Sequence, residues 1–182
     1  MSSDVRVRRV RPSGDADRHA LVAGLADVLI DCVEGGASAS FMAPLDPSRA
    51  EGHWVGVLGA VVAGTRMLFV AEDETGSVVG TVQVVPAAEE NQPHRADITK
   101  LLVHRRARRR GLADALMAAA EAAAVEAGLT LLVLDTASDE AVRVYERRGW
   151  TIVGVIEGFA LWPDGGLCGT TIFCKHLDGS PG

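Results

Sequence analysis

The sequence predicts a single α/β domain with a mixed, mostly antiparallel twisted sheet flanked by helices. A chain of 182 residues is enough for one domain and short for two. Its composition, 48% apolar and 23% charged, is that of an ordinary globular protein. Apolar residues recur with strand-like and helix-like periods in the order β-α-α-β-β-β-α-β-α-β-β, with no internal repeat or linker. We therefore expect one domain over residues 1–182, with about 178–182 as a frayed tail.

The N-terminal part is expected to hold one strand and two helices. Val5–Val10 alternates apolar and polar residues, as half-buried strands do. Apolar residues at helical spacing then predict a helix that Asp15 or Asp17 caps and that ends near Val33. The pair Asp46-Pro47 predicts the start of a second helix, because proline suits the first helical position.

The pattern then changes to shorter periods. Met67–Ala71 and Val78–Val85 flank a turn and predict a hairpin. Gly111–Ala127 is rich in alanine and predicts a helix, and the apolar run Leu131–Leu134 is typical of a central strand. The other expected elements are strands at Ala96–Val103, Thr151–Phe159 and Leu167–His176, and a short helix at Asp139–Arg148.

Composition also limits the classes of function. The formal net charge of -6 argues against a nucleic-acid-binding protein. Cys32, Cys168 and Cys174 show no close pairing, so we expect reduced thiols in a cytoplasmic protein. The histidines are scattered, so no metal site is expected. No apolar run is long enough to span a membrane, and the polar N-terminus does not look like a secretory signal.

A basic loop between an expected strand and helix carries the clearest chemical signal. A helix N-terminus presents unpaired N–H groups that bind phosphate, and Gly111 and small Ala113 leave room for it. The loop therefore suits a pyrophosphate. GxGxxG and Gly-Lys-Ser/Thr patterns are absent, which argues against a dinucleotide-binding fold and against a Walker-type nucleotide-binding protein. A solvated basic turn or a nucleic-acid patch is the alternative interpretation. The loop's arginines are Arg105, Arg106, Arg108, Arg109 and Arg110.

Two motifs resemble the GNAT family of N-acetyltransferases. Arg108–Ala113 fits the family's Q/R-x-x-G-x-G/A signature and follows a strand ending in Leu101–Val103. Ala141–Trp150 fits the family's A-x-x-x-Y-x-x-x-G-F pattern, with tryptophan in place of phenylalanine. The resemblance covers nearly the whole chain. It implies the GNAT fold and transfer of an acetyl group from acetyl-CoA to an amine, without a metal.

A narrower resemblance is to the tabtoxin resistance branch of that family, whose enzymes acetylate a β-lactam dipeptide toxin. The similar segments are Glu34–Met42, Arg95–Asp97, Leu134–Thr136 and Trp162–Gly165. This branch implies a small-molecule amine acceptor, an antibiotic or toxin among the candidates. Family members are often dimers, so the resemblance also implies a homodimer, with no nucleic acid or membrane as partner.

For acetyl-CoA, the resemblance implies binding by backbone and side chains of the basic loop. The backbone N–H groups of Arg108–Ala113 would hold the pyrophosphate. The exposed strand edge at Leu102 and Val103 would pair with the pantetheine amides. The cofactor-binding residues expected in the loop are Arg108, Arg109, Arg110, Gly111, Leu112 and Ala113.

Tyr145 is the only tyrosine and falls on the second motif. The matching tyrosine of the family donates a proton to the CoA thiolate. A phenol can do so because its pKa lies near that of the developing thiol. The alternative role is packing on the short helix around it.

Two aspartates compete for the role of base. Asp135 ends the apolar strand, where partial burial would raise its pKa. The tabtoxin resistance branch implies that role for it, and the alternative is a helix cap. Asp97 is the rival base, an anchor for a cationic substrate, or a solvated strand residue.

Substrate contacts are expected from the loop between the first two helices, through Ser38 and Phe41, together with Asp97. His104, beside the arginines, is expected to be exposed. Two other classes of function stay open at this point. The chain could be a non-catalytic acyl-CoA sensor on the same fold, or it could bind nucleic acid through the arginines.

Overall fold

A computed structural model of the chain describes residues 5–12 and 14–177; the expected frayed tail at 178–182 lies outside them. The elements are β1 (Arg6–Arg9), α1 (Asp15–Glu34), α2 (Pro47–Val62), β2 (Met67–Glu72), β3 (Val78–Pro86), β4 (Arg95–Val103), the short 3₁₀ helix η1 (Arg105–Ala107), α3 (Leu112–Glu126), β5 (Leu131–Thr136), α4 (Asp139–Arg147), β6 (Thr151–Leu161) and β7 (Leu167–His176).

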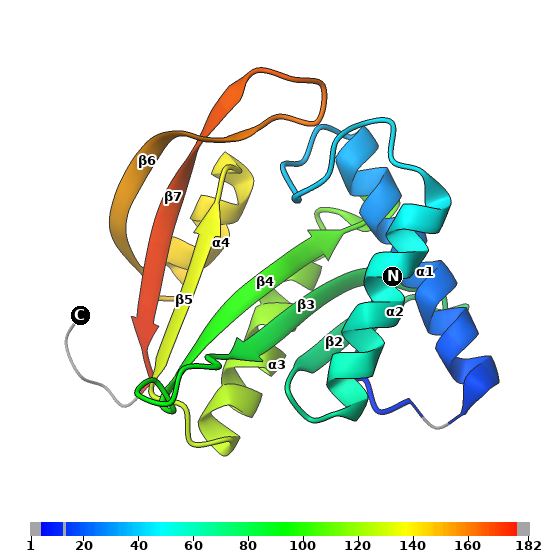
Figure 1. Ribbon diagram of the computed structural model, residues 1–182, viewed down its shortest axis with the longest axis horizontal. Coiled ribbons are helices and arrows are strands. Elements are labelled where there is room, and N and C mark those ends of the chain that lie inside the picture. The colour runs from blue at the N-terminus through cyan, green and yellow to red at the C-terminus, as the bar shows by residue number, and fades with distance from the viewer. Residues whose placement is uncertain (1–4, 13, 178–182) are drawn as a thin grey trace.

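One sheet of seven strands runs through the molecule in the order β1-β2-β3-β4-β5-β7-β6. Neighbouring strands are antiparallel except for β4 and β5, which are parallel. Figure 1 shows α1 and α2 together at one end of the sheet, with α3 and α4 behind it. The predicted α/β class with a mixed, mostly antiparallel sheet is confirmed, and the apolar run of β5 is a central strand as expected.

Two helix starts show how local sequence sets the boundaries. Asp46 caps α2, because its side chain accepts hydrogen bonds from the backbone N–H groups of Ser48 and Arg49. The expectation that Asp15 or Asp17 caps α1 is wrong, because the cap residue is Gly14 and makes no side-chain bond. Both aspartates lie in the first turn, where they favour the positive end of the helix dipole.

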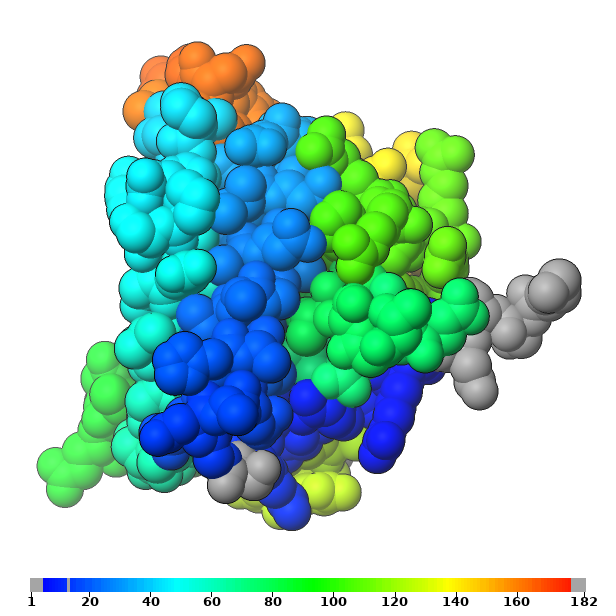
Figure 2. Space-filling model, turned by 90° about the vertical axis from the view of Figure 1, so that its right-hand side faces the viewer, coloured from blue at the N-terminus to red at the C-terminus, as the bar shows by residue number. Residues whose placement is uncertain are grey.

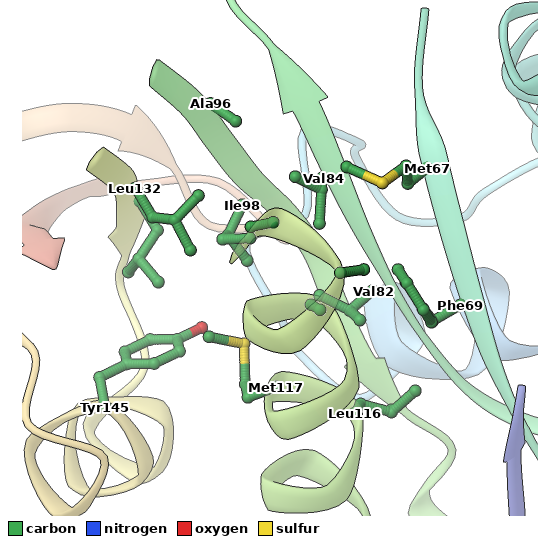
Figure 3. Packing of buried hydrophobic residues seen from close by; sticks show 14 of the residues in the cluster. Met67, Phe69, Val82, Val84, Ala96, Ile98, Leu116, Met117, Leu132 and Tyr145 are labelled. Carbon is green, nitrogen blue, oxygen red and sulfur yellow. The ribbon is translucent and has the colours of Figure 1, made fainter. Parts of the chain in front are cut away.

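The core has two parts, one on each face of the sheet. Leu25, Leu29 and Trp54 of α1 and α2 pack against the face that carries Leu68. On the other face, α3 and α4 pack against the sheet (Figure 3). Truncating one fully buried leucine of this kind to alanine costs about 3 kcal/mol of stability. The labelled residues of Figure 3 include Leu116, Met117, Leu132 and Tyr145.

The strands β4 and β5 separate after a short segment in which they are paired. Pairing covers only Arg95–Asp97 with Leu131–Val133, and beyond it the strands diverge (Figure 1). β4 also contains a register shift opposite Thr81–Gln83, where Lys100 adopts φ +52°. A bulge of this kind bends a strand and redirects a side chain. The divergence leaves one edge of β4 unpaired at the centre of the sheet, and this opening positions the site.

Candidate active site

A groove of about 1490 Å³ occupies the opening between β4 and β5. Its walls come from the α1–α2 loop, the second half of β4, the basic loop, the start of α4 and the tip of the β6–β7 hairpin. That tip lies against the α1–α2 loop, where the Ala43 N–H donates to the Pro163 carbonyl at 2.8 Å. In Figure 2 the orange hairpin tip borders the cyan end of this loop.

The basic loop enters α3 through two residues in the left-handed region. Arg109 has φ +61° and Gly111 has φ +74°. No side chain caps α3, so the first N–H groups of the helix have no side-chain partner. A Cβ built on Gly111 meets no atom within 4 Å, so a ligand can approach the backbone there. The backbone geometry therefore fits a pyrophosphate, as the motif predicts.

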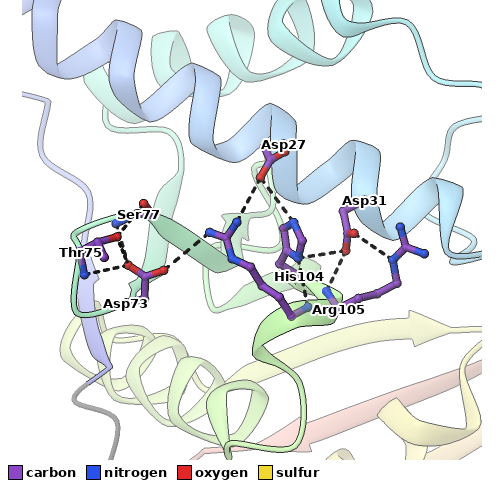
Figure 4. Close-up of polar contacts among 8 residues, drawn as sticks. Asp27, Asp31, Asp73, Thr75, Ser77, His104 and Arg105 are labelled. Carbon is purple, nitrogen blue, oxygen red and sulfur yellow. Dashed lines mark hydrogen bonds and ion pairs between the residues drawn. The ribbon is translucent and has the colours of Figure 1, made fainter.

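Two of the five arginines are anchors within the protein (Figure 4). Arg105 donates to Asp31 through Nε at 2.9 Å and through its backbone N–H at 2.7 Å. Arg106 lies 3.7 Å from a carboxylate oxygen of Asp73 and 4.0 Å from one of Asp27. These contacts tie the loop to α1 and reduce the positive charge that a nucleic acid would meet. Arg108, Arg109 and Arg110 remain for phosphate groups.

His104 belongs to the same anchor. Its side chain is mostly buried, 3.4 Å from Asp31 and 3.5 Å from Asp27, so the expectation of an exposed histidine is wrong. Burial opposes ionisation of Asp31, but hydrogen bonds from Arg105 and the nearby His104 outweigh it and lower its pKa. In Figure 2 the green loop lies directly beside the blue surface of α1.

The edge of β4 is only partly available for pairing. The His104 N–H donates to the Val79 carbonyl of β3. Along an antiparallel strand, the backbone groups of successive residues point alternately to one neighbouring strand and to the other side. Leu102 therefore directs its backbone groups toward β3, and its side chain is buried. Val103 faces the groove, where its carbonyl already accepts from Arg108 Nε at 3.2 Å and from Cys32 Sγ at 3.5 Å. The Val103 N–H and the neighbouring Leu101 suit the pantetheine better than Leu102.

Most of the expected cofactor-binding residues line the groove. Arg108, Arg109, Gly111 and Ala113 do so, as do Leu102 and Val103. Arg110 and Leu112 do not; the Leu112 side chain is 5% exposed and packs in the core. These two residues could contribute only backbone N–H groups.

Asp135 lies near the end of β5 on the groove wall. Its Oδ2 accepts from Thr170 Oγ1 at 2.8 Å, which fixes the carboxylate. The side chain is exposed, so the expected partial burial is wrong. The alternative role as a helix cap is also excluded, because Ser138 caps α4 by accepting from the Ala141 N–H.

Tyr145 projects from α4 toward the same place. Its ring packs between Trp150 and Phe173, with centroid distances of 5.9 and 5.4 Å. Figure 3 shows its hydroxyl end directed toward α3. Burial raises the pKa of Tyr145 well above its usual range, and the charge of Asp135 raises it further. The phenol thus stays protonated at neutral pH, although its pKa is not matched to that of a thiol as expected.

The expected substrate residues lie at two ends of the site. Ser38 and Phe41 line the groove, and Ser38 Oγ donates to the Leu161 carbonyl at 3.4 Å. Asp97 lies outside the groove, in an adjoining hollow of about 480 Å³. Its carboxylate is held by Arg95 at 2.7 Å, and its side chain is 41% exposed.

This second hollow contains three basic residues that the sequence did not single out. His53 of α2, Arg66 before β2 and Lys100 of β4 line it. Isolated basic residues in distant segments form no local sequence pattern. Only the bulge at Lys100 could have been a signal, and no sequence motif identifies such a bulge. The groove and the hollow share Ile98, Thr99, Lys100, Asp135 and Phe159.

Within residues 5–12 and 14–177, none of the helices has the length and continuous apolar character that a membrane span requires. In the same residues, no three His, Cys, Asp or Glu side chains are grouped so that they could hold a metal ion.

Residues 41–150 match the family model described as the acetyltransferase (GNAT) family. Among curated proteins, the N-terminal acetyltransferase complex ARD1 subunit homolog of Dictyostelium discoideum is 48% identical over 58 residues. That match spans 32% of this chain and 28% of the relative, so the chain covers under a third of the relative's length.

Solved structures share the fold over nearly the whole chain. A phosphinothricin acetyltransferase from Sinorhizobium meliloti, in complex with AcCoA, has TM-score 0.75 and 15% identity, covering 100% of this chain and 94% of its own. The acetyltransferase yncA from Salmonella typhimurium, with acetyl-CoA, has TM-score 0.76 and 16% identity, covering 99% and 98%. An acetyltransferase structure from Acinetobacter baylyi has TM-score 0.78 and 18% identity, covering 98% and 96%. The predicted GNAT fold is confirmed, and the chain belongs to the GNAT family of acetyltransferases.

Proposed function

We propose that the chain transfers the acetyl group of acetyl-CoA to the amine of a small molecule that binds in the hollow beside Asp135. Membership of the family makes it an acetyl-CoA-dependent acetyltransferase. The observation that carries the proposal is the meeting of the groove and the hollow at Asp135, Lys100 and Phe159. A donor in the groove and an acceptor in the hollow would face each other there.

The donor supplies an activated acetyl thioester when it is bound. The residues that would hold it are the backbone N–H groups of Arg108–Ala113 for the pyrophosphate and the β4 edge at Leu101 and Val103 for the pantetheine arm. Arg108 and Arg109, which line the groove, would contact its phosphates, because a guanidinium binds phosphate in a fork, and Arg110 would contribute its backbone N–H.

Two side chains would move protons. Asp135, fixed by Thr170, would take a proton from the acceptor amine. Tyr145, a protonated phenol in the wall of the groove, would donate one to the leaving thiolate. Asp97 is the weaker candidate for the base, since its ion pair with Arg95 already engages the carboxylate. We assign Asp97, with Ser38 and Phe41, to binding the acceptor.

We propose further that the acceptor is an antibiotic or toxin amine, with a tabtoxin-like β-lactam as the first probe. Support comes from the resemblance of the α1–α2 loop to the tabtoxin resistance branch. Structures named phosphinothricin acetyltransferase are also among those that share the fold. At 15–18% identity these structures support the fold and leave the acceptor to experiment.

A thiol-release screen with acetyl-CoA tests the acceptor class. The panel holds β-lactam dipeptides, aminoglycosides, streptothricin-like compounds, polyamines and peptide N-termini. We expect turnover of at least one small amine. Turnover of peptide N-termini alone would contradict a small-molecule acceptor. Acetyl-CoA binding without any turnover would favour the non-catalytic sensor.

The base assignment has its own test in Asp135→Asn. We expect turnover to fall about 10²-fold, the size of general base catalysis. The loss should be largest at low pH, where little of the amine is neutral, and should shrink as pH rises. Asp97→Asn is the matched control and should lose less. If Asp97→Asn shows the larger, pH-dependent loss, the two roles are exchanged.

The resemblance implies a homodimer, and we also propose that the two copies pair along β6. β6 is an edge strand that carries one charged side chain, Glu157, so little discourages pairing. A strand edge can pair antiparallel with its own copy about a twofold axis. Sedimentation should show a dimer that Val155→Lys dissociates and that Val125→Lys, at an equally exposed site on α3, leaves intact. A monomeric parent protein would contradict this. The exposed apolar residues of β6 are Ile152, Val153, Val155, Ile156, Phe159 and Leu161.

We propose a cytoplasmic location as well. Cys32, Cys168 and Cys174 are all free, which suits a reducing compartment.

A further inference from the structure

We infer that the hollow beside Asp135 contains an anion subsite, formed by Arg66, Lys100 and His53, that binds a carboxylate group of the acceptor. The acceptor would then carry a carboxylate as well as the amine that is acetylated. This inference rests on the proposed function for the position of the amine. It adds a binding site that the GNAT motifs do not contain.

Unsatisfied buried polar atoms gather at this end of the hollow. Arg66 donates through Nη1 to Gln83 Oε1, but its Nε is buried without a partner in the protein. Gln83 is fully buried, and its Nε2 has no partner either. The same holds for His53 Nε2. Nearly all buried polar groups in proteins are hydrogen-bonded, so the unpartnered Arg66 Nε and His53 Nε2, which belong to residues lining the hollow, indicate a ligand that carries oxygen atoms.

The charges at this end are also unbalanced. Within the part of the chain that the structure describes, neither Arg66 nor Lys100 forms an ion pair with a carboxylate. Burial, and then the charges of Lys100 and Arg66, lower the pKa of His53. Burial also lowers the pKa of Lys100; Asp135 opposes this shift and Arg66 adds to it. The cationic groups therefore repel one another, and a bound anion would relieve that repulsion.

The backbone holds Lys100 in this position. Lys100 sits at the β4 bulge with φ +52°, a conformation that costs a lysine about 1–2 kcal/mol. Its Nζ donates to Ser40 Oγ of the α1–α2 loop at 3.0 Å. Strain of this kind at a site wall is typical of a residue that binds ligand. Lys100 thus stands between the Arg66 end of the hollow and Asp135.

The sheet sets the distance between the two ends. Arg66 directly precedes β2 and Asp135 lies on β5, three strands away, so their backbones are at least about 14 Å apart, and the divergence of β4 and β5 beyond Val133 widens this distance. Both side chains shorten this distance by extending into the hollow. The spacing suits a carboxylate several bonds from the reacting amine, as in a dipeptide.

The test compares dipeptides with their C-terminal amides as acceptors at saturating acetyl-CoA. We expect the parent enzyme to show a KM at least tenfold lower for the free carboxylates, because a charge-assisted hydrogen bond is lost with the amide. Arg66→Gln should raise KM for the carboxylates alone and abolish the preference, and Lys100→Met should reduce it. The matched control Arg18→Gln removes an exposed arginine of α1 and should keep the preference.

Calorimetry of the same ligands with the enzyme–CoA complex separates this inference from the proposed function. If the enzyme binds the carboxylates selectively and Arg66→Gln removes this selectivity, the subsite is supported even if no ligand is acetylated. In that case the proposed acetylation of these acceptors is wrong. Equal turnover of carboxylates and amides overturns the subsite and leaves the proposed function standing. A preference that survives both Arg66→Gln and Lys100→Met also overturns it, as does the absence of carboxylate binding.

Discussion

The two sides of the site are built from different parts of the chain. The donor side that we propose would use mainly backbone groups of one continuous segment, Leu101–Ala113. The proposed acceptor side would use side chains from separate elements, among them His53, Arg66, Asp97 and Asp135. A backbone site can be encoded in a short motif, and it binds a constant ligand. A site made of scattered side chains can change its specificity one residue at a time without disturbing the donor.

The largest expected effect comes from Tyr145, which lines the groove. Tyr145→Phe keeps the ring contacts with Trp150 and Phe173 and removes only the hydroxyl. We expect turnover to fall about 100-fold, because the thiolate loses its proton donor. Acetyl-CoA affinity, measured by calorimetry, should stay within about twofold, which would separate chemistry from donor binding. Turnover within about threefold of the parent, with chemistry limiting, would return Tyr145 to a packing role.

The second-largest expected effect is on the stability of the protein and concerns Glu121. Glu121 of α3 is buried and accepts from Arg148, Lys175 and the Trp150 indole. Burial raises its pKa, but these three donors outweigh burial and lower it. We expect Glu121→Gln to cost about 3 kcal/mol in urea unfolding, because Arg148 and Lys175 lose a buried counter-charge.

The pH dependence of Glu121 follows from that shift. A carboxyl with a lowered folded-state pKa stabilises the protein above its unfolded value, near 4.3, and loses that contribution as pH falls through the folded value. The parent should therefore lose stability below about pH 4 more steeply than Glu121→Gln. Parallel stability–pH curves for the two proteins would contradict the network.

A smaller effect tests the donor side alone. Gly111→Ala places a side chain in the left-handed region, where the strain is about 1–2 kcal/mol, and adds a methyl group toward the pyrophosphate. We expect acetyl-CoA affinity to fall about tenfold, or 1.4 kcal/mol, without a change in acceptor preference.

Gly128→Ala is the control for Gly111→Ala. Gly128 has φ +77° and follows the other end of the same helix, away from the groove. Both variants should lose similar stability, but Gly128→Ala should bind acetyl-CoA like the parent. If the two variants bind equally well, the loop backbone is not the pyrophosphate site.

The smallest effect concerns the anchor of the basic loop. Asp31→Asn removes the charge that holds Arg105 and leaves an amide that can still accept a hydrogen bond. We expect about 1 kcal/mol less stability and an acetyl-CoA affinity only about threefold weaker, since Arg105 is an anchor in this account. Arg105→Gln is the comparison variant. If Asp31→Asn weakens acetyl-CoA binding as much as Arg105→Gln does, and without a loss of stability, Arg105 is a phosphate ligand instead of an anchor.

The fold was predictable because its signals are local. The proline and aspartate at the start of α2 and the apolar run of β5 each act within a few residues. The start of α1 was missed because Asp15 and Asp17 suit both a cap and a first turn. The 3₁₀ helix η1 was missed because three residues, Arg105–Ala107, are too few to show a periodic pattern.

In the sequence, a local motif indicates only the proposed donor side of the site, for the same reason. In the sequence Arg105 is one of five arginines in the basic loop, but its partner Asp31 is 74 residues away and makes it an anchor. Arg66 and His53 come together with Lys100 only through the sheet and the packing of α2. The exposure of Asp135 likewise depends on how β4 and β5 diverge, which no local pattern records.

Backbone amide NMR during titration with CoA tests the division of the site most directly. The 182-residue chain is small enough for residue-by-residue assignment. We expect the largest shifts at the amides of Leu101, Val103 and the loop from Arg108 to Ala113, with little change at His53 and Arg66. Largest shifts at His53, Arg66 and Asp97, with a quiet basic loop, would contradict it.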